Sequence, residues 1–186
     1  MMLRLMDMTI SLLGLIFICP IIIVLIIFGF MDTGSPFFVQ ERLGRYQKPF
    51  NLWKLRTMQV GTKSVPTHLA CPTKVTRYGA FLRQTKLDEL PQLWNVLIGD
   101  MSFVGPRPSL ISQQELTIER ARRGIFNVRP GITGLSQICG IDMSTPAELA
   151  AMDAKMIENL DLKNYVTYLL KTLAGAGRGD RIRSSK

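Results

Sequence analysis

The longest apolar stretch of the chain lies near its N-terminus, where no charged residue occurs between positions 8 and 31. The 21 residues of segment 10–30 are enough to cross the hydrocarbon core of a bilayer as a helix. Pro20 follows Cys19 near the middle of this segment, and a proline inside a helix removes a hydrogen-bond donor and favours a kink. The pattern therefore predicts a membrane helix, which either spans the bilayer or breaks at Cys19 and Pro20 and returns to the side that it entered from.

The residues that flank this segment bear on its orientation. Arg4 and Asp7 form a weakly charged start and no small-x-small cleavage site follows Phe30, so we expect the segment to be retained rather than removed as a signal peptide. Basic residues crowd its C-terminal side and favour a cytoplasmic body; they are Arg42, Arg45, Lys48, Lys54 and Arg56. Arg4 weakly favours the same side for the N-terminus, which hints at re-entry and leaves both topologies open.

The rest of the chain alternates short apolar patterns with polar turns and predicts a mostly helical α+β fold. Extended segments are expected over 36–44 and 50–58 around a turn, followed by a polar loop over 59–76. Helices are predicted over 77–85, 88–98, 110–123, 146–160 (with Pro146 in the first turn) and 162–173. Extended segments are predicted over 101–105 and 135–139, and a turn-rich loop over 128–134. The last helix has a broad apolar face that can pack on a core or lie on a membrane interface.

The distribution of charge indicates what the protein binds, because the part of the chain that follows the apolar segment is strongly basic. The chain carries 23 Lys and Arg against 14 Asp and Glu, a formal net charge of +9. Residues 1–41 hold one basic and three acidic residues, so the rest carries 22 basic and 11 acidic residues, a net charge of +11. A basic body beside an apolar N-terminus indicates phosphate-bearing partners, an anionic membrane surface or both. No helix-turn-helix, zinc-finger or RNP-like pattern occurs, so a nucleic acid partner is not expected.

Cysteine and histidine usage excludes several kinds of chemistry. Cys19, Cys71 and Cys139 are far apart and odd in number, which argues against a disulfide framework or a zinc site and fits a reducing compartment. His68 is the only histidine, so a His-dependent triad or a His-rich metal site is not expected. Carboxylates are therefore the leading candidates for acid–base or nucleophilic chemistry.

The segment 86–93 (Lys-Leu-Asp-Glu-Leu-Pro-Gln-Leu) holds the strongest candidate pair, Asp88 and Glu89, at the expected first turn of a helix. An isolated pair at this place more often caps the helix and complements its dipole. Successive helical side chains diverge by about 100°, so the two carboxylates do not flank a substrate as those of glycosidases do. They can approach one phosphate from the same side, and a carboxylate that attacks phosphorus forms an acyl phosphate. The positive end of the helix dipole is expected to favour the ionised nucleophile.

Several basic residues lie in settings that restrict their geometry. Lys54 and Arg56 share one face of a predicted strand, because side chains alternate with a period of two. Arg107 lies between two prolines, and Arg129 precedes Pro130 and Gly131 in a predicted turn. The planar donor fork of arginine matches phosphate oxygens, whereas a carboxylate can hold Mg²⁺. A diphosphate with a divalent cation would use both kinds of group.

These features occur together in five motifs that follow the Pro20-interrupted apolar segment in a definite order. The motifs are residues 40–44 (Gln-Glu-Arg-Leu-Gly), 54–58 (Lys-Leu-Arg-Thr-Met), 87–97 (Leu-Asp-Glu-Leu-Pro-Gln-Leu-Trp-Asn-Val-Leu), 99–108 (Gly-Asp-Met-Ser-Phe-Val-Gly-Pro-Arg-Pro) and 128–135 (Val-Arg-Pro-Gly-Ile-Thr-Gly-Leu). With them the chain resembles the bacterial sugar transferase family, the small monotopic phosphoglycosyl transferases that begin glycoconjugate assembly on polyprenyl phosphate. The resemblance spans nearly the whole chain.

The resemblance implies a phosphotransferase that moves a sugar-1-phosphate from a UDP-sugar to undecaprenyl phosphate and releases UMP. In the family the Asp of the dyad, here Asp88, is the nucleophile and forms a phosphosugar-aspartate intermediate, with Mg²⁺ placed near it. Glu89 completes the dyad, and its role, metal support or proton transfer, stays open. Arg107 matches a phosphate-contacting position. Further candidates for diphosphate, nucleotide or lipid phosphate are Lys54, Arg56, Arg83 and Arg129.

The resemblance also implies a location and an organisation. The family's membrane helix is re-entrant, which predicts a helix-break-helix over 1–35, a catalytic domain over 36–174 on the cytoplasmic face of the bacterial inner membrane, and a mobile basic tail over 175–186. The catalytic domain is expected to lie on the membrane interface, in contact with lipids. The activity would initiate O-antigen, capsule or glycoprotein glycan assembly. A homo-oligomer is compatible with this organisation, and the motifs do not distinguish one UDP-sugar from another.

Three positions depart from the family pattern. Cys19 and Pro20 stand where Ser-Pro is usual, and residues 139–141 (Cys-Gly-Ile) stand where many members have Asn-Gly-Arg. Lys86 precedes the dyad where a small residue is common, and a cation there is expected to favour the ionised form of Asp88. The alternative to an enzyme is a membrane-anchored protein that binds an anionic lipid or a nucleotide without releasing UMP.

Overall fold

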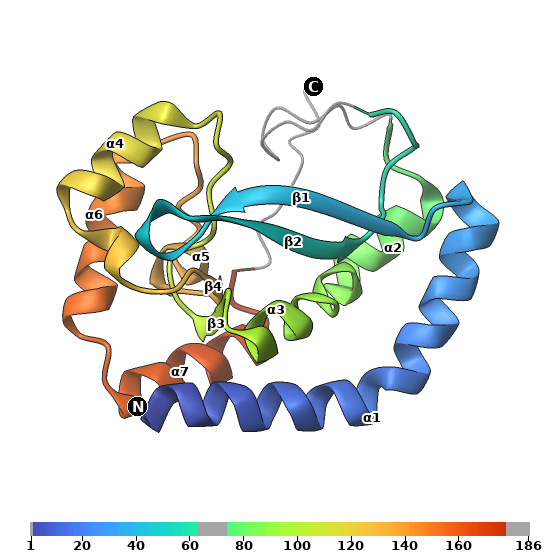
Figure 1. Cartoon of the computed structure of the whole chain (residues 1–186), viewed down its shortest axis with the longest axis horizontal. Coiled ribbons are helices and arrows are strands. Elements are labelled where there is room, and N and C mark those ends of the chain that lie inside the picture. Colours follow the sequence, from blue (N-terminus) through green and yellow to red (C-terminus); the bar gives the residue numbers. More distant parts are fainter. Residues whose placement is uncertain (1, 63–73, 178–186) are drawn as a thin grey trace.

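The computed structural model describes residues 2–62 and 74–177. In these parts of the chain helices predominate, and the strands form two small two-stranded sheets, so the expected mostly helical α+β fold is confirmed. The longest helix lies along one side of the molecule and the remaining elements gather against it (Figure 1). The expected tail over 175–186 falls mainly outside the described residues.

The N-terminal apolar segment forms α1 (Met2–Thr33), which contains Pro20 and continues through it. By length and composition, α1 can cross a membrane, and most of its apolar side chains are exposed. Its axis turns in the C-terminal part, toward α2 (Figure 1). The expected break is therefore a bend within one helix, because a proline removes one hydrogen bond without ending the hydrogen-bonding pattern on either side.

The N-terminal end of α1 is fastened to the body by charged side chains. Arg4 donates hydrogen bonds to two carbonyls in the last turn of α3 (Gln92–Ile98), at 2.6 and 2.9 Å. Asp7 is buried, and its Oδ1 accepts hydrogen bonds from the Phe103 amide at 3.2 Å and from the Tyr165 hydroxyl. A cation at the carbonyl end of a helix and a satisfied buried carboxylate are both favourable arrangements.

The C-terminal end of α1 also contacts the body. The Tyr78 hydroxyl donates to the Leu25 carbonyl at 2.6 Å, beside the bend of α1. The Thr76 hydroxyl donates to Asp32 Oδ2 at 2.7 Å. Both ends of the apolar helix are therefore bound to the same domain.

A β-hairpin follows α1, where the sequence predicted two extended segments around a turn. β1 (Phe37–Leu43) pairs in antiparallel register with β2 (Pro49–Leu55) across the short turn η1 (Arg45–Gln47). Leu52 and Leu55 of β2 are buried, which gives the strand one face on the core. The next residues after β2 pass close to α2 (Arg77–Thr85), whose predicted bounds are confirmed.

Gly79 allows α2 to approach this backbone. A Cβ at position 79 would lie 2.0 Å from the Thr57 carbonyl oxygen, so only glycine fits. Leu82 of the same helix is fully buried with Leu25 and Leu55, and this cluster joins α1, β2 and α2. The close contact brings the end of β2 and the end of α2 together, and both ends carry site residues.

The dyad lies between α2 and α3, in a short 3₁₀ turn, η4 (Leu87–Glu89), rather than in the first turn of a helix over 88–98. Lys86 ends α2 in the left-handed conformation, with φ of 62°, and Pro91 caps α3. The predicted helix is divided because proline cannot donate the hydrogen bond that would continue it from the preceding turn.

The C-terminal half surrounds a two-stranded parallel sheet of β3 (Ser102–Val104) and β4 (Gly131–Thr133). Its helices are α4 (Gln114–Arg122), η5 (Ile125–Asn127), α5 (Leu135–Ile138), α6 (Pro146–Glu158) and α7 (Leu162–Leu173). The prediction of a strand over 135–139 was wrong, because these residues form α5. The loop expected over 128–134 contains β4, which is ordered by its pairing with β3 rather than by its own pattern.

A hydrophobic cluster under this sheet anchors α7. Val104, Met156, Tyr165 and Tyr168 are buried in it, and Met6 of α1 packs against it. Next to this buried part of the helix surface, α7 exposes Leu162, Val166, Leu170 and Leu173. The broad apolar face that the sequence predicted for α7 is therefore partly packed on the core and partly exposed.

Candidate active site

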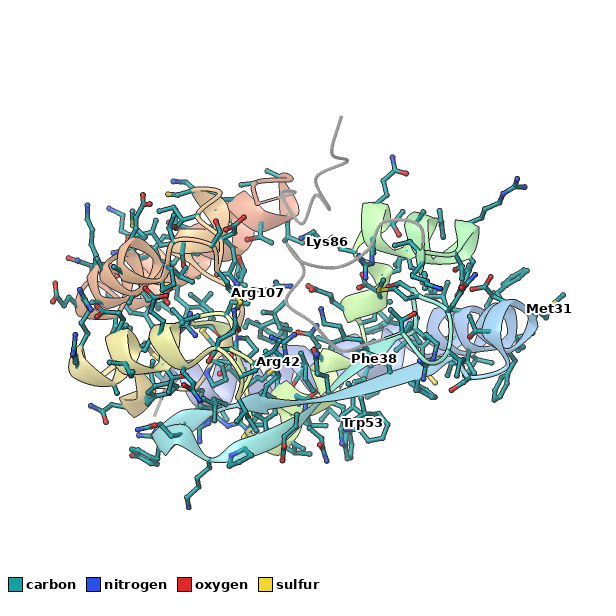
Figure 2. All side chains as sticks on the ribbon, turned by 90° about the horizontal axis from the view of Figure 1, so that it is seen from above. Met31, Phe38, Arg42, Trp53, Lys86 and Arg107 are labelled. Atoms are coloured by element: carbon teal, nitrogen blue, oxygen red, sulfur yellow. The ribbon has the colours of Figure 1, made fainter. Side chains whose placement is uncertain are left out.

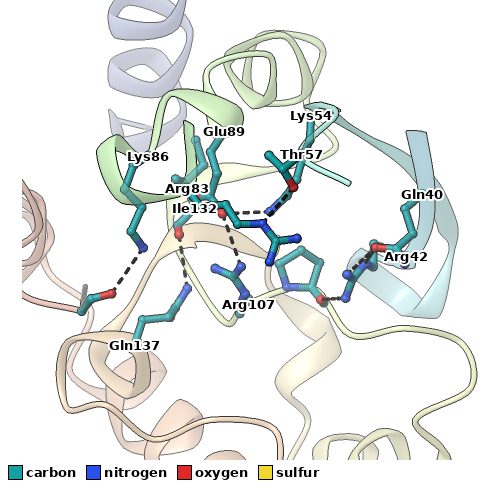
Figure 3. A network of polar contacts seen from close by, with 12 residues as sticks. Gln40, Arg42, Lys54, Thr57, Arg83, Lys86, Glu89, Arg107, Ile132 and Gln137 are labelled. Carbon is teal, nitrogen blue, oxygen red and sulfur yellow. Dashed lines mark hydrogen bonds and ion pairs between the residues drawn. The ribbon is translucent and has the colours of Figure 1, made fainter. Parts of the chain in front are cut away.

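The candidate site forms where three segments meet: the end of β2, the η4 turn and the loop after β3. Lys54 reaches it from β2, Glu89 from η4, and Arg107 from the loop (Figure 3). Lys86 and Arg107 lie toward the middle of the molecule, whereas Met31 at the end of α1 lies at its edge (Figure 2). The structure therefore brings together residues that are up to 53 positions apart, from Lys54 to Arg107.

Glu89 lies between two cations. Its Oε1 accepts a hydrogen bond from Lys54 Nζ at 2.9 Å and from Arg107 Nη2 at 3.3 Å. The Glu89 side chain is 11% exposed, so both ion pairs are largely shielded from water. Burial disfavours the charged form of Glu89, but Lys54, Arg107 and Lys86 outweigh it and hold the pKa of Glu89 far below its ordinary value.

Asp88 is in a different state from its neighbour. It is 8% exposed, and no side chain or amide in the described ranges donates a hydrogen bond to its carboxylate. Burial raises the pKa of Asp88 to about 6; Lys54, Arg83 and Arg107 oppose this shift, whereas the charge of Glu89 adds to it. One carboxylate of the dyad is thus held ionised by cations, and the other is weakly solvated and free of partners within the described chain.

This result corrects the expectation for the ionisation of Asp88. The short 3₁₀ turn does not offset the desolvation of the carboxylate, and the pKa of Asp88 rises instead of falling. Lys86 donates to the Gly177 carbonyl at 3.3 Å, and its charge lowers the pKa of Glu89. The cation that precedes the dyad therefore acts on Glu89.

Arg83 brings a third cation to the site from the last turn of α2. Its Nε donates to the Thr57 hydroxyl at 2.8 Å, which fixes the plane of the guanidinium group. Its Nη1 is buried, and within residues 2–62 and 74–177 nothing accepts a hydrogen bond from it. The Arg83 and Arg107 guanidinium groups face the same space beside Glu89 (Figure 3). Arg83 thus offers an unused, charged donor of the kind that binds phosphate oxygens.

Two other predicted phosphate contacts lie away from the dyad. Arg56 Nε donates to the Ser35 carbonyl at 2.8 Å and its Nη2 donates to the Phe37 carbonyl at 2.9 Å, so Arg56, just after β2, binds the segment that leads from α1 into β1. Arg129 Nε donates to the Gly99 carbonyl at 2.7 Å, behind the C-terminal end of α3. Burial together with the nearby charges of Arg4 and Arg45 lowers the pKa of Arg129.

A cavity of about 1230 Å³ opens beside the dyad. Lys86, Glu89 and Arg107 form its polar end, while Asp88 is not part of the lining. The apolar part is lined by side chains of α1, α3 and α7, among them Met6, Ile10, Leu93, Val166, Leu169 and Leu170. A single cavity thus joins charged groups of the site to the exposed apolar faces of α1 and α7.

The positions that depart from the family pattern fall in two places. Cys19 is exposed on α1, next to the proline of the bend. Gly140 and Ile141 line the cavity, so the residue that stands in place of an arginine adds an apolar group to its wall. The cation expected from the pattern is therefore replaced by apolar surface at this point of the cavity.

The donor set for a divalent cation is small. No group of three or more His, Cys, Asp or Glu residues converges within the described residues, and Glu89 is engaged by Lys54 and Arg107. Of the dyad, Asp88 is the carboxylate whose oxygens accept no hydrogen bond from the described residues. Mg²⁺ is commonly held by one or two carboxylates together with substrate phosphates, so this set fits Mg²⁺ only when phosphate oxygens complete it.

Asp88→Asn is expected to stabilise the metal-free protein at high pH. Because the pKa of Asp88 is raised to about 6 from 3.8, the folded state holds this proton more tightly than the unfolded state. The ionisation of Asp88 therefore opposes folding, with a penalty that is absent below about pH 4 and complete above about pH 6. We expect the substitution to raise the free energy of unfolding by roughly 1–3 kcal/mol at pH 8 and to leave it almost unchanged at pH 4.

Thermal or denaturant unfolding in detergent with EDTA, at pH 4 and pH 8, measures this difference. Glu89→Gln is the matched control, because it removes a carboxylate that its ion pairs stabilise, and it should destabilise the protein at pH 8. A loss of stability for Asp88→Asn at pH 8 would contradict the assignment of a desolvated, unpartnered Asp88.

Comparison with known proteins adds independent evidence. Residues 1–178 match the family model described as Bacterial sugar transferase. The chain is 38% identical over 179 residues to an uncharacterised sugar transferase of Bacillus subtilis, covering 94% of this chain and 88% of that protein. It is 34% identical over 174 residues to the UDP-galactose-lipid carrier transferase of Erwinia amylovora, covering 83% of this chain and 36% of that protein. It is 42% identical over 142 residues to the UDP-glucose:undecaprenyl-phosphate glucose-1-phosphate transferase of Klebsiella pneumoniae, covering 74% and 30%.

The chain thus spans well under half the length of two of these relatives, whereas it matches nearly all of the Bacillus subtilis protein. The family model covers α1, the β-hairpin, the dyad and every described element that follows. On this match, the chain belongs to the bacterial sugar transferase family.

Proposed function

We propose that this protein is a phosphotransferase that moves a sugar-1-phosphate from a UDP-sugar to undecaprenyl phosphate. The observation that carries the proposal is the asymmetry of the dyad: Asp88 is buried and unpartnered among the described residues, beside a Glu89 that is held by Lys54 and Arg107. The printed names of several relatives support the substrate classes, since they name undecaprenyl phosphate and UDP-glucose or UDP-galactose. The reaction would initiate the assembly of a surface polysaccharide or another glycoconjugate.

The first chemical step uses Asp88 as a nucleophile. A carboxylate oxygen of Asp88 attacks the phosphorus that carries the sugar, and the bond from that phosphorus to the bridging oxygen breaks. UMP leaves with the bonding electron pair, and a phosphosugar-aspartate remains on the protein. The raised pKa of Asp88 fits this role, because a poorly solvated carboxylate gains most from forming a bond to phosphorus.

The second step regenerates the protein. A phosphate oxygen of undecaprenyl phosphate attacks the same phosphorus, the bond between phosphorus and the Asp88 oxygen breaks, and Asp88 leaves as a carboxylate. The product is undecaprenyl diphosphate linked to the sugar. Two successive displacements at one phosphorus need no general base for the nucleophile, because both attacking groups are anions.

The cations around the dyad are proposed to bind the negative oxygens. Arg83 offers Nη1, which has no acceptor within the described residues, and Arg107 and Lys54 contact Glu89 beside it. Positive charge placed before the reaction stabilises the charge that develops on transferring phosphoryl groups. Glu89 would hold Lys54 and Arg107 in place, so we assign it a positioning role.

We propose Mg²⁺ as the cofactor, held by Asp88 together with oxygens of the donor diphosphate. When bound, it would neutralise charge on the diphosphate and on the departing UMP. This assignment rests on the free carboxylate of Asp88 and on the fit of the donor set described above.

The membrane arrangement that fits best is re-entrant and monotopic, on the cytoplasmic face of the inner membrane. Arg4 and Asp7 at one end of α1, and Asp32 at the other, contact the same domain. A helix that crossed the bilayer would separate these ends by the full hydrocarbon thickness. The apolar part of the cavity, between α1 and α7, would then receive the polyprenyl chain from the bilayer, with its phosphate at the polar end.

UMP release tests the activity. Purified protein in detergent or nanodiscs is incubated with a panel of UDP-sugars and Mg²⁺, with and without undecaprenyl phosphate. We expect lipid-dependent turnover with at least one sugar, and a loss of at least 10³-fold in Asp88→Asn, whose amide cannot form the covalent bond.

Arg56→Gln is the control, since Arg56 follows directly after β2 and contacts backbone carbonyls away from the dyad. It should retain most of the turnover. Binding of a UDP-sugar without UMP release, unchanged in Asp88→Asn, would instead support a non-catalytic binding protein.

Cysteine accessibility tests the topology. In a variant without native cysteines, Met2→Cys should resist a membrane-impermeant thiol reagent in intact cells and react in inverted membrane vesicles. Ala121→Cys, on the exposed surface of α4, should behave in the same way. Labelling of residue 2, but not of residue 121, in intact cells would contradict the re-entrant arrangement.

A further inference from the structure

We propose that the buried ion pair of Arg120 and Asp153 is a positioning device that aims Arg107 at the reacting phosphate. Its catalytic consequence rests on the proposed function, whereas its effect on the loop that carries Arg107 does not. A chain of contacts supports this inference: it runs from α6 through α4 to the Arg107 backbone and ends at Glu89.

The loop over 106–109 is held from outside through its carbonyl groups. Pro106 and Pro108 have no N–H groups, so this loop has few donors with which to stabilise itself. Four consecutive carbonyls instead accept hydrogen bonds from donors in other segments. The donors are Gly131 N to Pro106 at 2.9 Å, Arg120 Nη1 to Arg107 at 2.7 Å, Arg42 Nη1 to Pro108 at 3.0 Å and Leu43 N to Ser109 at 3.0 Å.

Arg120 supplies the contact at Arg107 itself. It is 2% exposed, and its Nε and Nη2 donate to Asp153 Oδ2 at 3.1 and 2.6 Å. Asp153 is fully buried, and its second oxygen accepts a hydrogen bond from the Ser136 hydroxyl at 2.6 Å. Arg120 on α4, Asp153 on α6 and Ser136 on α5 thus form one satisfied polar network under the loop.

The network has features that helix packing does not require. Two apolar side chains would hold α4 against α6 without the desolvation of two charges, and such replacements are often neutral or stabilising. They would not donate a hydrogen bond to the Arg107 carbonyl. The planar fork of arginine directs Nε and Nη2 to the carboxylate and Nη1 to the carbonyl at the same time, whereas a lysine is a single point donor.

The anchor can affect the site because the carbonyl that Arg120 holds and the side chain that reaches Glu89 belong to the same residue, Arg107. The carbonyl of Arg107 is fixed by Arg120, and the side chain of the same residue reaches Glu89 at 3.3 Å. A loop that loses this anchor can move Arg107 away from Glu89 and from the phosphate. Displacements of about 1 Å at a catalytic group can lower the rate by roughly 10²-fold.

Hydrogen–deuterium exchange of the whole protein tests the anchor without any substrate. We expect Arg120→Lys to increase exchange in peptides that cover 103–112, while peptides from α2 and α3 keep the wild-type rate. Leu116→Ala, a buried apolar change on the same helix, is the control for lost packing, and it should raise exchange across α4 without selecting the 103–112 loop. Unchanged exchange of the loop in Arg120→Lys would overturn the proposal.

The double variant Arg120→Met with Asp153→Leu controls for a loss of folding in the single variant, because it leaves no unpaired buried charge. It should unfold at a temperature close to that of the wild type or above it, and still show faster exchange over 103–112. Its kcat/KM for UMP release should fall about 10- to 100-fold. A stable double variant with wild-type exchange and wild-type kcat/KM would show that the pair is merely structural.

A double-mutant cycle with Arg107→Ala separates positioning from a general loss of activity. If Arg120 acts through Arg107, then Arg120→Lys should lower kcat/KM several-fold in the wild-type background and have little further effect in Arg107→Ala. Equal losses in both backgrounds would contradict the proposal. If the wild-type protein releases no UMP, the proposed function fails, and the exchange experiment still decides whether Arg120 and Asp153 anchor the loop.

Discussion

The site depends on one interaction, the Glu89 carboxylate placed between Lys54 and Arg107. These contacts join the end of β2, the η4 turn and the loop after β3, which are distant in the sequence. Removing one partner would leave a buried charge without compensation, which is far more costly than the net value of the pair. The same interaction makes the two carboxylates of the dyad differ in pKa. The cations hold Glu89 ionised, whereas the adjacent Asp88 has no hydrogen-bond partner in the described chain and its pKa is raised.

The surrounding fold supports this arrangement from two directions. Gly79 lets α2 pack against the backbone beyond β2, which brings Arg83 and Lys54 to the same region. On the other side, Arg120 and Asp153 hold the loop that carries Arg107. α1 completes the structure, since both of its ends contact the domain and one face of its N-terminal half lines the cavity. The charged groups Lys86, Glu89 and Arg107 and the apolar side chains of α1 and α7 therefore line one cavity.

Local patterns in the sequence predicted the parts of this structure that local interactions stabilise. The helix over 77–85 formed as expected, and two extended segments lie around a turn, as β1 and β2. Arg107, which the flanking prolines singled out, reaches Glu89. The strand β4 and the helix α5 were not predicted, because a three-residue strand and a four-residue helix depend on packing against distant segments. Arg120 and Asp153 were missed for a similar reason: each is an ordinary charged residue of an amphipathic helix until the fold buries them together. The available signal was their spacing: Arg120 follows Leu116 by four positions and Asp153 follows Leu149 by four, so each charged residue lies on the apolar face of its helix.

The most direct test of the account is to find where the phosphosugar is attached. The protein is incubated with Mg²⁺ and the UDP-sugar that supports UMP release, without undecaprenyl phosphate, and analysed by intact-protein and peptide mass spectrometry. We expect the added mass of one sugar phosphate on the peptide that contains Asp88, its loss when undecaprenyl phosphate is added, and its absence in Asp88→Asn. UMP release with no adduct, or an adduct on Glu89, would contradict the assignment of Asp88 as the nucleophile.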